Sequence, residues 1–456
     1  MEQCAIVLAA WEDNQMCSAE AKVMLEAAGK PVVTWVKKAL DQAGIIDQMY
    51  IVGHRQEKVR AELGETVAFA LQEVPLGTGH AVNQAELFLY ERKGATIVMA
   101  GDTPLIRPET ITRLLESFAA GNWGALVMTA EVEDPVGYGR ILRDETGRLI
   151  AIVEEGEADA ETRAIREVNG GIYCFDTELL NQTIVQIEEH EEGRIPLTDV
   201  IEIMSQMGVA VGTLEIDPQE FFKVNTRRDL ALASQILNRR ILDRIMVGGV
   251  SITDPDTTWI DDDVTIGSDT VILPQTTILN SCVIGRRCKI GPASTLNFTY
   301  VGDDSTVSRT ESSQALIDKN CQIGPWVRLR QGVEIGENCV IGSFVEINDS
   351  RLGANCQIQS QVVINQATLG HNVTVDSQVS LVGGSSGDRM REEIFVGNHS
   401  FIGSHSCLVA PARLDKNSYV ATGTTVTGNV PRNALAIGRR ELKIKENWAL
   451  HRNDEL

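Results

Sequence analysis

The stretch Thr265-Ile-Gly-Ser-Asp-Thr-Val-Ile-Leu-Pro-Gln-Thr-Thr-Ile-Leu-Asn-Ser-Cys-Val-Ile-Gly-Arg-Arg-Cys-Lys-Ile290 carries an aliphatic residue at every sixth position. The recurring residues are Ile266, Ile272, Ile278, Ile284 and Ile290, followed by Leu296. The same spacing governs residues 317–347 and, after shifts of one residue, 352–364, 369–381 and 402–426. Neither a helix nor a single amphipathic strand has this period. A coil with three short flat faces does, so the pattern predicts a parallel β-helix. The alternative is chance aliphatic periodicity in a β-rich domain.

The predicted solenoid runs from about residue 250 to 432. The six-residue spacing of aliphatic residues is interrupted at 297–316 and again at Gly383-Gly-Ser-Ser-Gly-Asp-Arg389. The second interruption is polar, so we expect a loop that leaves the coil there. After Pro431 comes a tail, 433–456, in which residues 441–448 could form a short helix.

The first 226 residues alternate between strand and helix patterns. Residues 4–10, 49–53 and 95–102 are predicted strands, and 31–43 is a predicted helix with Pro31 at its start. Such alternation predicts a Rossmann-like α/β domain with a mostly parallel sheet, whose ligands lie beyond the carboxyl ends of the strands. Residues 227–249 are predicted to form a linker helix between this domain and the solenoid.

Composition excludes several classes of partner. The formal charge of −22 and pI near 4.8 argue against nucleic acid and anionic membranes, because phosphates require a basic face. No stretch reaches the ~20 apolar residues of a membrane span, and the start is no signal peptide. Nine cysteines lie scattered without a CxxC pair, which indicates buried thiols in a reducing cytoplasm, with metal binding as the alternative. We therefore expect a cytoplasmic protein.

Several local motifs resemble one family along the whole chain. They are Leu76-Gly-Thr-Gly-His-Ala81, Ala100-Gly-Asp-Thr-Pro-Leu105, Asp134-Pro-Val-Gly-Tyr-Gly-Arg140, Phe344-Val-Glu346, Leu408-Val-Ala-Pro411 and Thr424-Thr-Val-Thr427. The chain is similar to the bifunctional bacterial enzymes of UDP-N-acetylglucosamine synthesis, which join a glucosamine-1-phosphate acetyltransferase to an N-acetylglucosamine-1-phosphate uridyltransferase. The resemblance implies a nucleotidyltransferase domain, a left-handed hexapeptide β-helix, Mg²⁺ as cofactor and a homotrimer packed through the β-helices. Membership alone does not establish activity.

The triphosphate loop departs from this family. Relatives place Gly-Xaa-Gly-Thr-Arg after the first strand and then a Pro-Lys pair; this chain has Trp11-Glu-Asp-Asn-Gln15 and Ala21-Lys22. Glycines let the backbone approach phosphates, and the basic residues neutralise the departing pyrophosphate. Each added acid would repel a phosphate charge by about 3 kcal/mol at ~5 Å and an effective dielectric of about 20. We therefore expect this loop to oppose triphosphate binding.

Other positions of that pocket match the family. The resemblance assigns Lys22 to catalysis, Asp102 and Asn225 to Mg²⁺, and two further groups to the nucleotide and the sugar. These groups are Gln72, Gly77 and Thr78 for the nucleotide, and Gly139, Glu154 and Asn169 for the sugar. The alternatives are a solvated Lys22, an Asp102 that only ends a strand and an Asn225 that only forms a turn. The family pattern is lost at Lys223, at Val153-Glu-Glu-Gly156 and at Gly193-Arg-Ile-Pro196.

The acetyltransferase positions are also altered. The family's histidine base falls on Ser360, its tyrosine on Val363 and a substrate-contacting lysine on Asn348. Serine cannot serve as the base near neutral pH. The positions that still match sugar or coenzyme contacts are Arg330, Ser404, Ala421 and Arg439. Arg330 could equally be a solvated solenoid arginine, and His371, His399 or His405 would have to act as a relocated base.

Three hypotheses follow. The first is a non-catalytic homologue that binds a nucleotide sugar or sugar phosphate, or assembles with other proteins, including mixed trimers with an active relative. The second is an Mg²⁺-dependent sugar-1-phosphate nucleotidyltransferase with an altered donor or substrate and no acetyl transfer. The third is an ordinary bifunctional enzyme that tolerates these changes. Turnover with nucleoside triphosphates separates the first from the other two.

Overall fold

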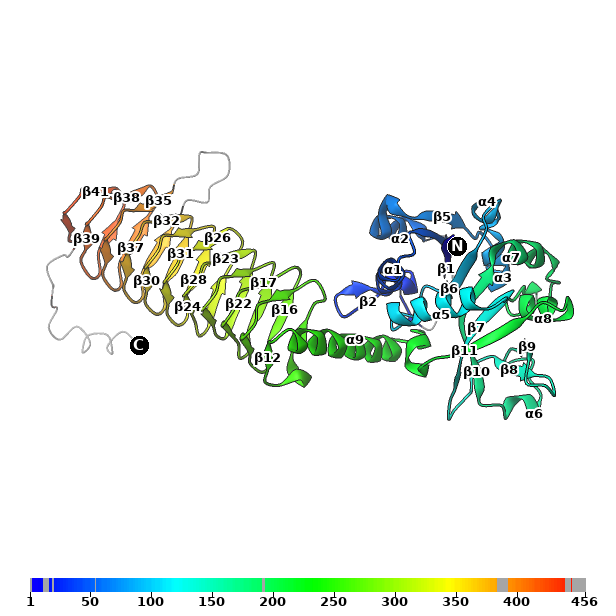
Figure 1. The fold of residues 1–456 in the computed structure, drawn as a ribbon. Helices are drawn as coiled ribbons and strands as arrows, with labels where there is room; N and C mark the ends of the chain where they lie inside the picture. Colours follow the sequence, from blue (N-terminus) through cyan, green and yellow to red (C-terminus); the bar gives the residue numbers. More distant parts are fainter. Residues whose placement is uncertain are drawn as a thin grey trace, which may run out of the picture. The chain divides into compact units, whose positions relative to one another are not determined.

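The computed structural model describes residues 2–10, 16–18, 20–53, 55–190, 193–383, 393–438 and 444 (Figure 1). The chain divides into two compact units, Met1–Leu237 and Asn238–Leu456. The division falls within one continuous helix, α9 (Arg227–Val247). The triphosphate loop 11–15, the predicted loop at 384–389, Arg439 and the predicted tail helix lie outside the described residues.

A nine-stranded mixed sheet forms the centre of the first unit, in the order β11-β7-β10-β6-β1-β4-β5, with β8 and β9 attached to β10. Its middle strands are parallel, whereas β10 is antiparallel to both β6 and β7. The strands are β1 (Gln3–Ala9), β4 (Asp47–Val52), β5 (Ala68–Leu71), β6 (Ala95–Ala100), β7 (Ala125–Glu131), β8 (Arg140–Arg143), β9 (Leu149–Val153), β10 (Glu167–Asp176) and β11 (Val211–Glu215); β2 (Glu26–Ala27) and β3 (Lys30–Pro31) pair separately. The predicted α/β class is confirmed.

Helices cover both faces of this sheet (Figure 1). They are α1 (Val32–Gln42), α2 (Gln56–Leu63), α3 (Thr78–Asn83), α4 (Glu86–Leu89), α5 (Pro108–Ala120), α6 (Ala160–Arg163), α7 (Thr177–Thr183) and α8 (Asp199–Gln206). Strands such as β1, β4 and β6 are almost entirely apolar because both of their faces are buried. One apolar cluster includes Val36 and Leu114, and the other includes Val82 and Ile201. The parallel strands β1, β4 and β6 therefore end at one common edge, where polar residues can gather.

The second unit is the predicted left-handed β-helix, whose short strands form three parallel sheets along the coil (Figure 1). Register confirms the six-residue count, because Ile266 pairs with Ile284, Ile272 with Ile290 and Ile278 with Leu296. Each aliphatic residue thus stacks on its counterpart one coil earlier, and these side chains are buried except for the partly buried Ile266. No helix among the described residues combines the length and apolarity that crossing a bilayer requires.

The three faces of the β-helix are defined by their strands. The first face comprises β12 (Ser251–Ile252), β15 (Val271–Ile272), β18 (Lys289–Ile290), β21 (Thr306–Val307), β24 (Gln322–Ile323), β27 (Val340–Ile341), β30 (Gln357–Ile358), β33 (Thr374–Val375), β36 (Phe401–Ile402), β39 (Tyr419–Val420) and β42 (Leu435–Ala436). The second comprises β13 (Trp259–Ile260), β16 (Thr277–Leu279), β19 (Thr295–Asn297), β22 (Thr310–Ser313), β25 (Val327–Leu329), β28 (Glu346–Asn348), β31 (Val363–Asn365), β34 (Ser380–Val382), β37 (Cys407–Val409) and β40 (Thr425–Val426). The third comprises β14 (Thr265–Ile266), β17 (Val283–Ile284), β20 (Tyr300–Val301), β23 (Ala315–Ile317), β26 (Val333–Ile335), β29 (Arg351–Leu352), β32 (Ala367–Leu369), β35 (Ile394–Val396), β38 (Ala412–Leu414) and β41 (Asn429–Val430). Strand β42 lies beyond residue 432, where the expected solenoid ended.

The six-residue spacing is interrupted at 297–316, but the coil continues through this stretch. The inward residues there are Val301, Val307 and Ser312, which pair with Ile284, Ile290 and Leu296 of the preceding coil. Several corners in this stretch are one residue shorter, so the spacing drops from six to five. Ser312 also replaces an aliphatic residue; it is 1% exposed, and its hydroxyl bonds that of Thr299 at 2.9 Å. A buried polar group is tolerated because it has this partner.

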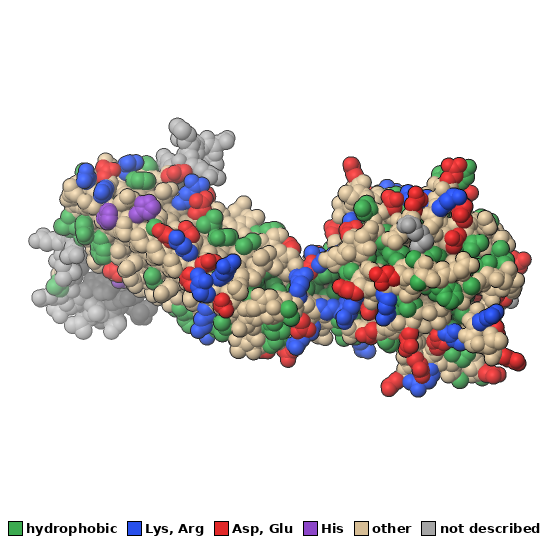
Figure 2. Space-filling view, viewed as in Figure 1, with side chains coloured by type: hydrophobic (Ala, Val, Ile, Leu, Met, Phe, Trp, Pro, Cys, Tyr) green, Lys and Arg blue, Asp and Glu red, His purple; other side chains and the backbone are tan. Residues whose placement is uncertain are grey.

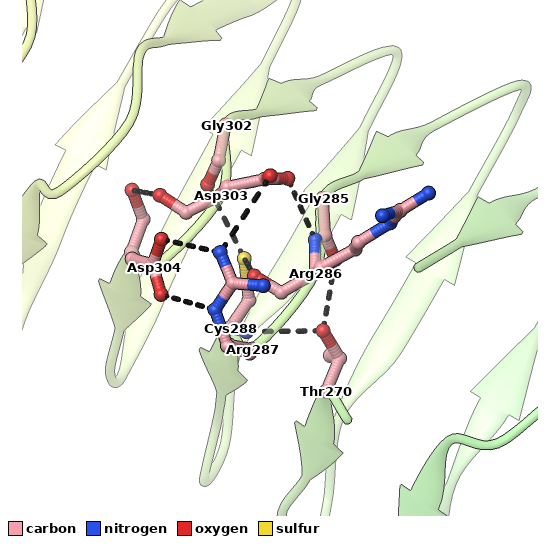
Figure 3. A network of polar contacts seen from close by, with 9 residues as sticks. Thr270, Gly285, Arg286, Arg287, Cys288, Gly302, Asp303 and Asp304 are labelled. Carbon is pink, nitrogen blue, oxygen red and sulfur yellow. Dashed lines mark hydrogen bonds and ion pairs between the residues drawn. The ribbon is translucent and has the colours of Figure 1, made fainter. Parts of the chain in front are cut away.

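A column of small polar side chains connects successive coils from inside (Figure 3). The Sγ of Cys288 donates to the carbonyl oxygen of Gly302 at 3.2 Å, and the hydroxyl of Thr270 donates to that of Gly285 at 2.8 Å. Equivalent bonds are made by Ser305, Cys321, Cys339, Cys356 and Ser400. Most cysteines are therefore buried, as predicted, although Cys17 is exposed and Cys407 is half-buried. Burial raises the pKa of the Cys288 thiol, which favours the neutral donor.

Candidate functional site

Lys22, Asp102 and Asn225 meet at the carboxyl edge of the central sheet. Lys22 begins a 3-10 turn, η2 (Lys22–Met24), Asp102 follows β6, and Asn225 precedes α9. The Nζ of Lys22 donates to Oδ2 of Asp102 at 2.6 Å and to Oδ1 of Asn225 at 3.0 Å. The backbone N–H of Val224 donates to the carbonyl oxygen of Asp102 at 3.0 Å, which ties the two segments together. The Lys22 side chain is only 5% exposed, so it is not a solvated surface lysine.

The second carboxylate oxygen of Asp102, Oδ1, is buried and has no hydrogen-bond partner. Carboxylate and amide oxygens suit Mg²⁺, which usually takes one or two protein ligands and completes its shell with phosphates and water. Among the described residues no group of three His, Cys, Asp or Glu side chains could hold a metal alone. Asp102 and Asn225 therefore fit a metal that is shared with a phosphate ligand. When bound, Mg²⁺ would neutralise phosphate charge.

The predicted nucleotide residues form one tight turn before α3. Gln72 Nε2 donates to the carbonyl oxygen of Gly77 at 3.1 Å, and Thr78 Oγ1 accepts from the backbone N–H of Leu197 at 2.9 Å. Gly77 has φ +112°, and a Cβ added there would lie 2.7 Å from the carbonyl oxygen of Ile195. Only glycine therefore fits this turn without moving a neighbouring backbone. The structure brings Gln72, Gly77 and Thr78 together.

The segment 193–196, which departs from the family pattern, supports that turn. Ile195 donates its backbone N–H to the carbonyl oxygen of Leu76 at 2.6 Å and accepts from Gly79 at 2.8 Å. These are backbone contacts, so they do not require the family's side chains. No pattern in the sequence predicted these contacts.

The predicted sugar residues lie around the antiparallel strand β10. The backbone N–H of Asn169 donates to the carbonyl oxygen of Gly139 at 2.8 Å. The Asn169 side-chain amide donates to the hydroxyl of Tyr173 at 2.7 Å and accepts from the N–H of Gly171 at 2.9 Å. Burial raises the pKa of Tyr173, so its phenol stays neutral at ordinary pH. Glu154 accepts from the Thr198 hydroxyl at 3.2 Å.

Two further side chains order the loops near these residues, and sequence reasoning missed their roles. Arg140 is 1% exposed and donates to Glu155 at 2.6 Å. Glu155 also accepts from the backbone N–H of Gly137 at 3.3 Å, and its pKa is lowered chiefly by the hydrogen bond from Arg140. Glu155 is one of the residues that depart from the family pattern. Arg140 begins the short strand β8 and is buried there, and a buried guanidinium needs a partner acid.

His190 joins two acids, which the sequence did not indicate. Its Nε2 lies 2.7 Å from Oδ2 of Asp199, at the start of α8, and its Nδ1 lies 3.2 Å from Oε1 of Glu157. Hydrogen bonds to Asp199 and then Glu157 raise the pKa of His190. Burial raises the pKa of the Asp199 carboxyl despite the adjacent imidazole. The protonated form of His190 therefore stabilises this contact.

The acetyltransferase-like positions lie on the β-helix. Arg330 pairs with Glu346 at 2.7 Å, with both side chains more than two-fifths exposed. The Ser404 hydroxyl donates to Oδ2 of Asp376 at 2.6 Å, which lowers the pKa of that carboxyl, and the Ala421 carbonyl oxygen accepts from Ser406 at 3.1 Å. Arg330 and Ser404 thus have separate partners, and Arg439 lies outside the described residues.

Some positions hold the general base and its assisting residues in relatives. In this chain those positions make ordinary contacts between coils or face solvent. The side-chain amide of Asn348 donates to Asn365 at 2.9 Å on the next coil, and Val363 is 43% exposed. Histidine side chains gather toward the C-terminal part of the solenoid on the face that Figure 2 shows. On the solenoid, Nδ1 of His371 already accepts from the backbone N–H of Ala354 at 3.0 Å.

Comparisons with known protein families divide the chain in the same way. A nucleotidyl transferase profile matches residues 16–219. A bacterial transferase hexapeptide profile matches residues 263–298 and 315–349, and a hexapeptide repeat of succinyl-transferase matches 393–428.

On the face drawn in Figure 2, acidic and basic side chains are interspersed over the first unit.

Full-length relatives cover both units. The "Bifunctional protein GlmU" of Acetivibrio thermocellus is 38% identical over 98% of this chain and 97% of its own length. The proteins of the same name from Clostridium kluyveri and Clostridioides difficile are 36% and 35% identical, over 98% and 99% of this chain and 98% of each relative. Identity at this level over both units, together with the nucleotidyltransferase fold and the hexapeptide β-helix, places the chain in the GlmU family of bifunctional proteins.

Proposed function

We propose that the first unit binds a nucleotide sugar or sugar phosphate of the UDP-N-acetylglucosamine type, without the turnover of a bifunctional enzyme. The observation that carries this proposal is the ordered frame around the pocket. Gln72 fixes the Gly77 turn, and Asn169 is held by Gly139 and Tyr173. A preformed frame of this kind binds its ligand without a large ordering cost.

The proposal that turnover is lost rests on the sequence of the triphosphate loop. Glu12 and Asp13 add negative charge, and Gln15 stands where relatives have arginine. A diphosphate sugar carries its charge on groups that Lys22 and a metal could neutralise, whereas a triphosphate needs further neutralisation from this loop. Product-like ligands should therefore bind better than the triphosphate donor.

A second candidate function is an Mg²⁺-dependent sugar-1-phosphate nucleotidyltransferase with an altered donor. The buried, unpartnered Oδ1 of Asp102 favours it, since a carboxylate oxygen without a donor is ready for a cation. Lys22 would act as the group that neutralises the reacting phosphate, and Asn225 as the second metal ligand.

One experiment separates the two candidates. Purified protein receives Mg²⁺, N-acetylglucosamine-1-phosphate and each nucleoside triphosphate in turn, and pyrophosphate release is measured. In parallel, calorimetry measures binding of UDP-N-acetylglucosamine. Binding without release supports the first candidate, and release well above background supports the second. If neither occurs in folded protein, both are wrong.

A double variant tests the triphosphate loop. Trp11→Gly with Asp13→Gly removes one acid and both Cβ atoms from the expected triphosphate path. If the loop is what blocks the donor, the variant should gain measurable UTP binding while UDP-N-acetylglucosamine binding stays unchanged. Equal UTP binding by the variant and the natural chain would contradict this account.

For the second unit we propose that acetyl transfer to glucosamine-1-phosphate is absent, because Ser360, Val363 and Asn348 offer no base. Acetyl-coenzyme A consumption above background with glucosamine-1-phosphate would refute this. We also propose a homotrimer: the second face exposes Val363, Val382 and Val409 on successive strands, which suits packing against another copy. Light scattering that gives a monomer mass would remove this proposal, and co-purification with an active relative would support mixed trimers.

A further inference from the structure

We infer that the ammonium group of Lys22 occupies side-chain oxygens of Asp102 and Asn225 and competes with a divalent metal ion for them. The inference concerns the same site as the proposed function, but it requires only that the metal binds and not that any substrate is turned over. It assigns Lys22 a role in controlling when the site accepts a metal.

The first argument is geometric. A single ammonium group reaches one oxygen of each expected ligand, Asp102 Oδ2 at 2.6 Å and Asn225 Oδ1 at 3.0 Å. A metal ion that takes this pair of oxygens would have to replace the ammonium group as their cation. The two cations therefore exclude each other from this pair of oxygens.

The second argument is electrostatic. The side chains of Lys22 and Asp102 are 5% and 12% exposed, so water screens their charges poorly. The ammonium group already neutralises the carboxylate, and its short hydrogen bond is of the charge-assisted kind. A divalent ion must therefore displace a buried, hydrogen-bonded like charge before it gains both ligands. A bare aspartate and asparagine would present no such barrier.

The third argument concerns what releases Lys22. Among the described residues, the ammonium group of Lys22 donates to Asp102 and Asn225, so once displaced from them it would need another anionic partner. A phosphate on a bound ligand is such a partner, because a lysine ammonium binds phosphate as a point charge. Phosphate ligand and metal would then enter together, with Lys22 moving from the carboxylate to the phosphate. Without a phosphate ligand the site should hold metal weakly.

The test measures Mn²⁺ affinity of the full chain by electron paramagnetic resonance of free Mn²⁺, with no nucleotide present. Lys22→Met removes the charge and keeps a long side chain, so affinity should rise by about tenfold or more. Lys22→Arg keeps the charge, and its affinity should remain close to that of the natural chain. Adding Asp102→Asn to Lys22→Met should abolish the gain, which places the new binding at this carboxylate.

The matched control is Lys37→Met, which removes the partly exposed lysine of the Lys37–Asp41 pair and should leave Mn²⁺ affinity unchanged. If Lys22→Met does not fold, as judged by circular dichroism, Lys22→Gln serves instead, because its amide can still donate to Asp102. Unchanged or weaker affinity in the folded, uncharged variant overturns the inference, as does an equal rise in Lys22→Arg. UDP-N-acetylglucosamine binding is measured on the same samples. Its absence beside a raised Mn²⁺ affinity would refute the proposed function and leave this inference standing.

Discussion

Replacing Gly77 by alanine should separate steric cost from backbone strain at the nucleotide turn. Gly77 has φ +112° and ψ 177°, and Gly64 at the end of α2 has φ +70° and ψ −166°. Both lie in a region that only glycine populates freely, which costs another residue about 1–3 kcal/mol. They differ in their surroundings: a Cβ at Gly64 meets nothing within 4 Å, whereas one at Gly77 lies 2.7 Å from the Ile195 carbonyl oxygen.

The magnitude follows from this difference. In Gly77→Ala the Ile195 backbone must move, which weakens its hydrogen bonds with Leu76 and Gly79. Two such bonds contribute about 1 kcal/mol each. We therefore expect Gly64→Ala to cost about 1–3 kcal/mol. Gly77→Ala should cost roughly 1–2 kcal/mol more than that.

The assay is urea unfolding of each variant followed by helix circular dichroism. The described α-helices all lie at or before Val247, so this signal reports chiefly on the first unit. The shift in transition midpoint, multiplied by the urea dependence, gives the change in unfolding free energy. Calorimetry should also find that UDP-N-acetylglucosamine binding is weakened by Gly77→Ala alone. Equal costs for the two variants, or a larger cost for Gly64→Ala, would refute the steric argument.

Three other predictions concern the rest of the chain. Because hydrogen bonds to Asp199 and Glu157 raise the pKa of His190, its stabilisation is fully present below the unfolded-state pKa and is lost as pH rises through the folded-state pKa. The urea midpoints of the natural chain and His190→Gln should therefore converge as the pH is raised above the ordinary histidine pKa of about 6.5. Ile341→Ala, at a residue 1% exposed, should cost about 2–5 kcal/mol in guanidinium unfolding, whereas Val340→Ala, 41% exposed, should cost within about 0.5 kcal/mol. Cys339→Ser should keep its bond to the Gly353 carbonyl oxygen, but Cys339→Ala should lose about 1 kcal/mol in the same assay.

The β-helix could be predicted from the sequence because its signal is local. Each coil repeats one geometry, so residues such as Ile266 and Ile284 must recur at fixed spacing to stack. The prediction lost the count where this geometry varies, at corners one residue shorter and at Ser312, whose buried hydroxyl replaces an aliphatic side chain. A search for a fixed six-residue spacing cannot recognise a coil in which one corner is a residue shorter.

The site could be predicted only through the family resemblance. Lys22 and Asn225 lie 203 residues apart, and their contact depends on the order of strands in the sheet, which no local pattern encodes. Resemblance supplied the residues but not their contacts. It did not show that Lys22 would hold Asp102, nor that Glu155 would pair with Arg140, because those contacts involve side chains of this particular chain.

The positions that depart from the family pattern bear on whether the pocket is a remnant. A pocket without a ligand could lose its internal bonding at little cost, and buried groups would be left without partners. Here the departures instead make contacts: Glu155 accepts from Arg140, although the Nε of that arginine has no partner, and Ile195 holds the turn at Gly79. Among the described residues that the resemblance assigns to the pocket, the buried side-chain atom without a partner is Oδ1 of Asp102. A free carboxylate oxygen on Asp102, beside a displaceable ammonium group, is suited to receiving a cation with its ligand, which favours retained binding over decay.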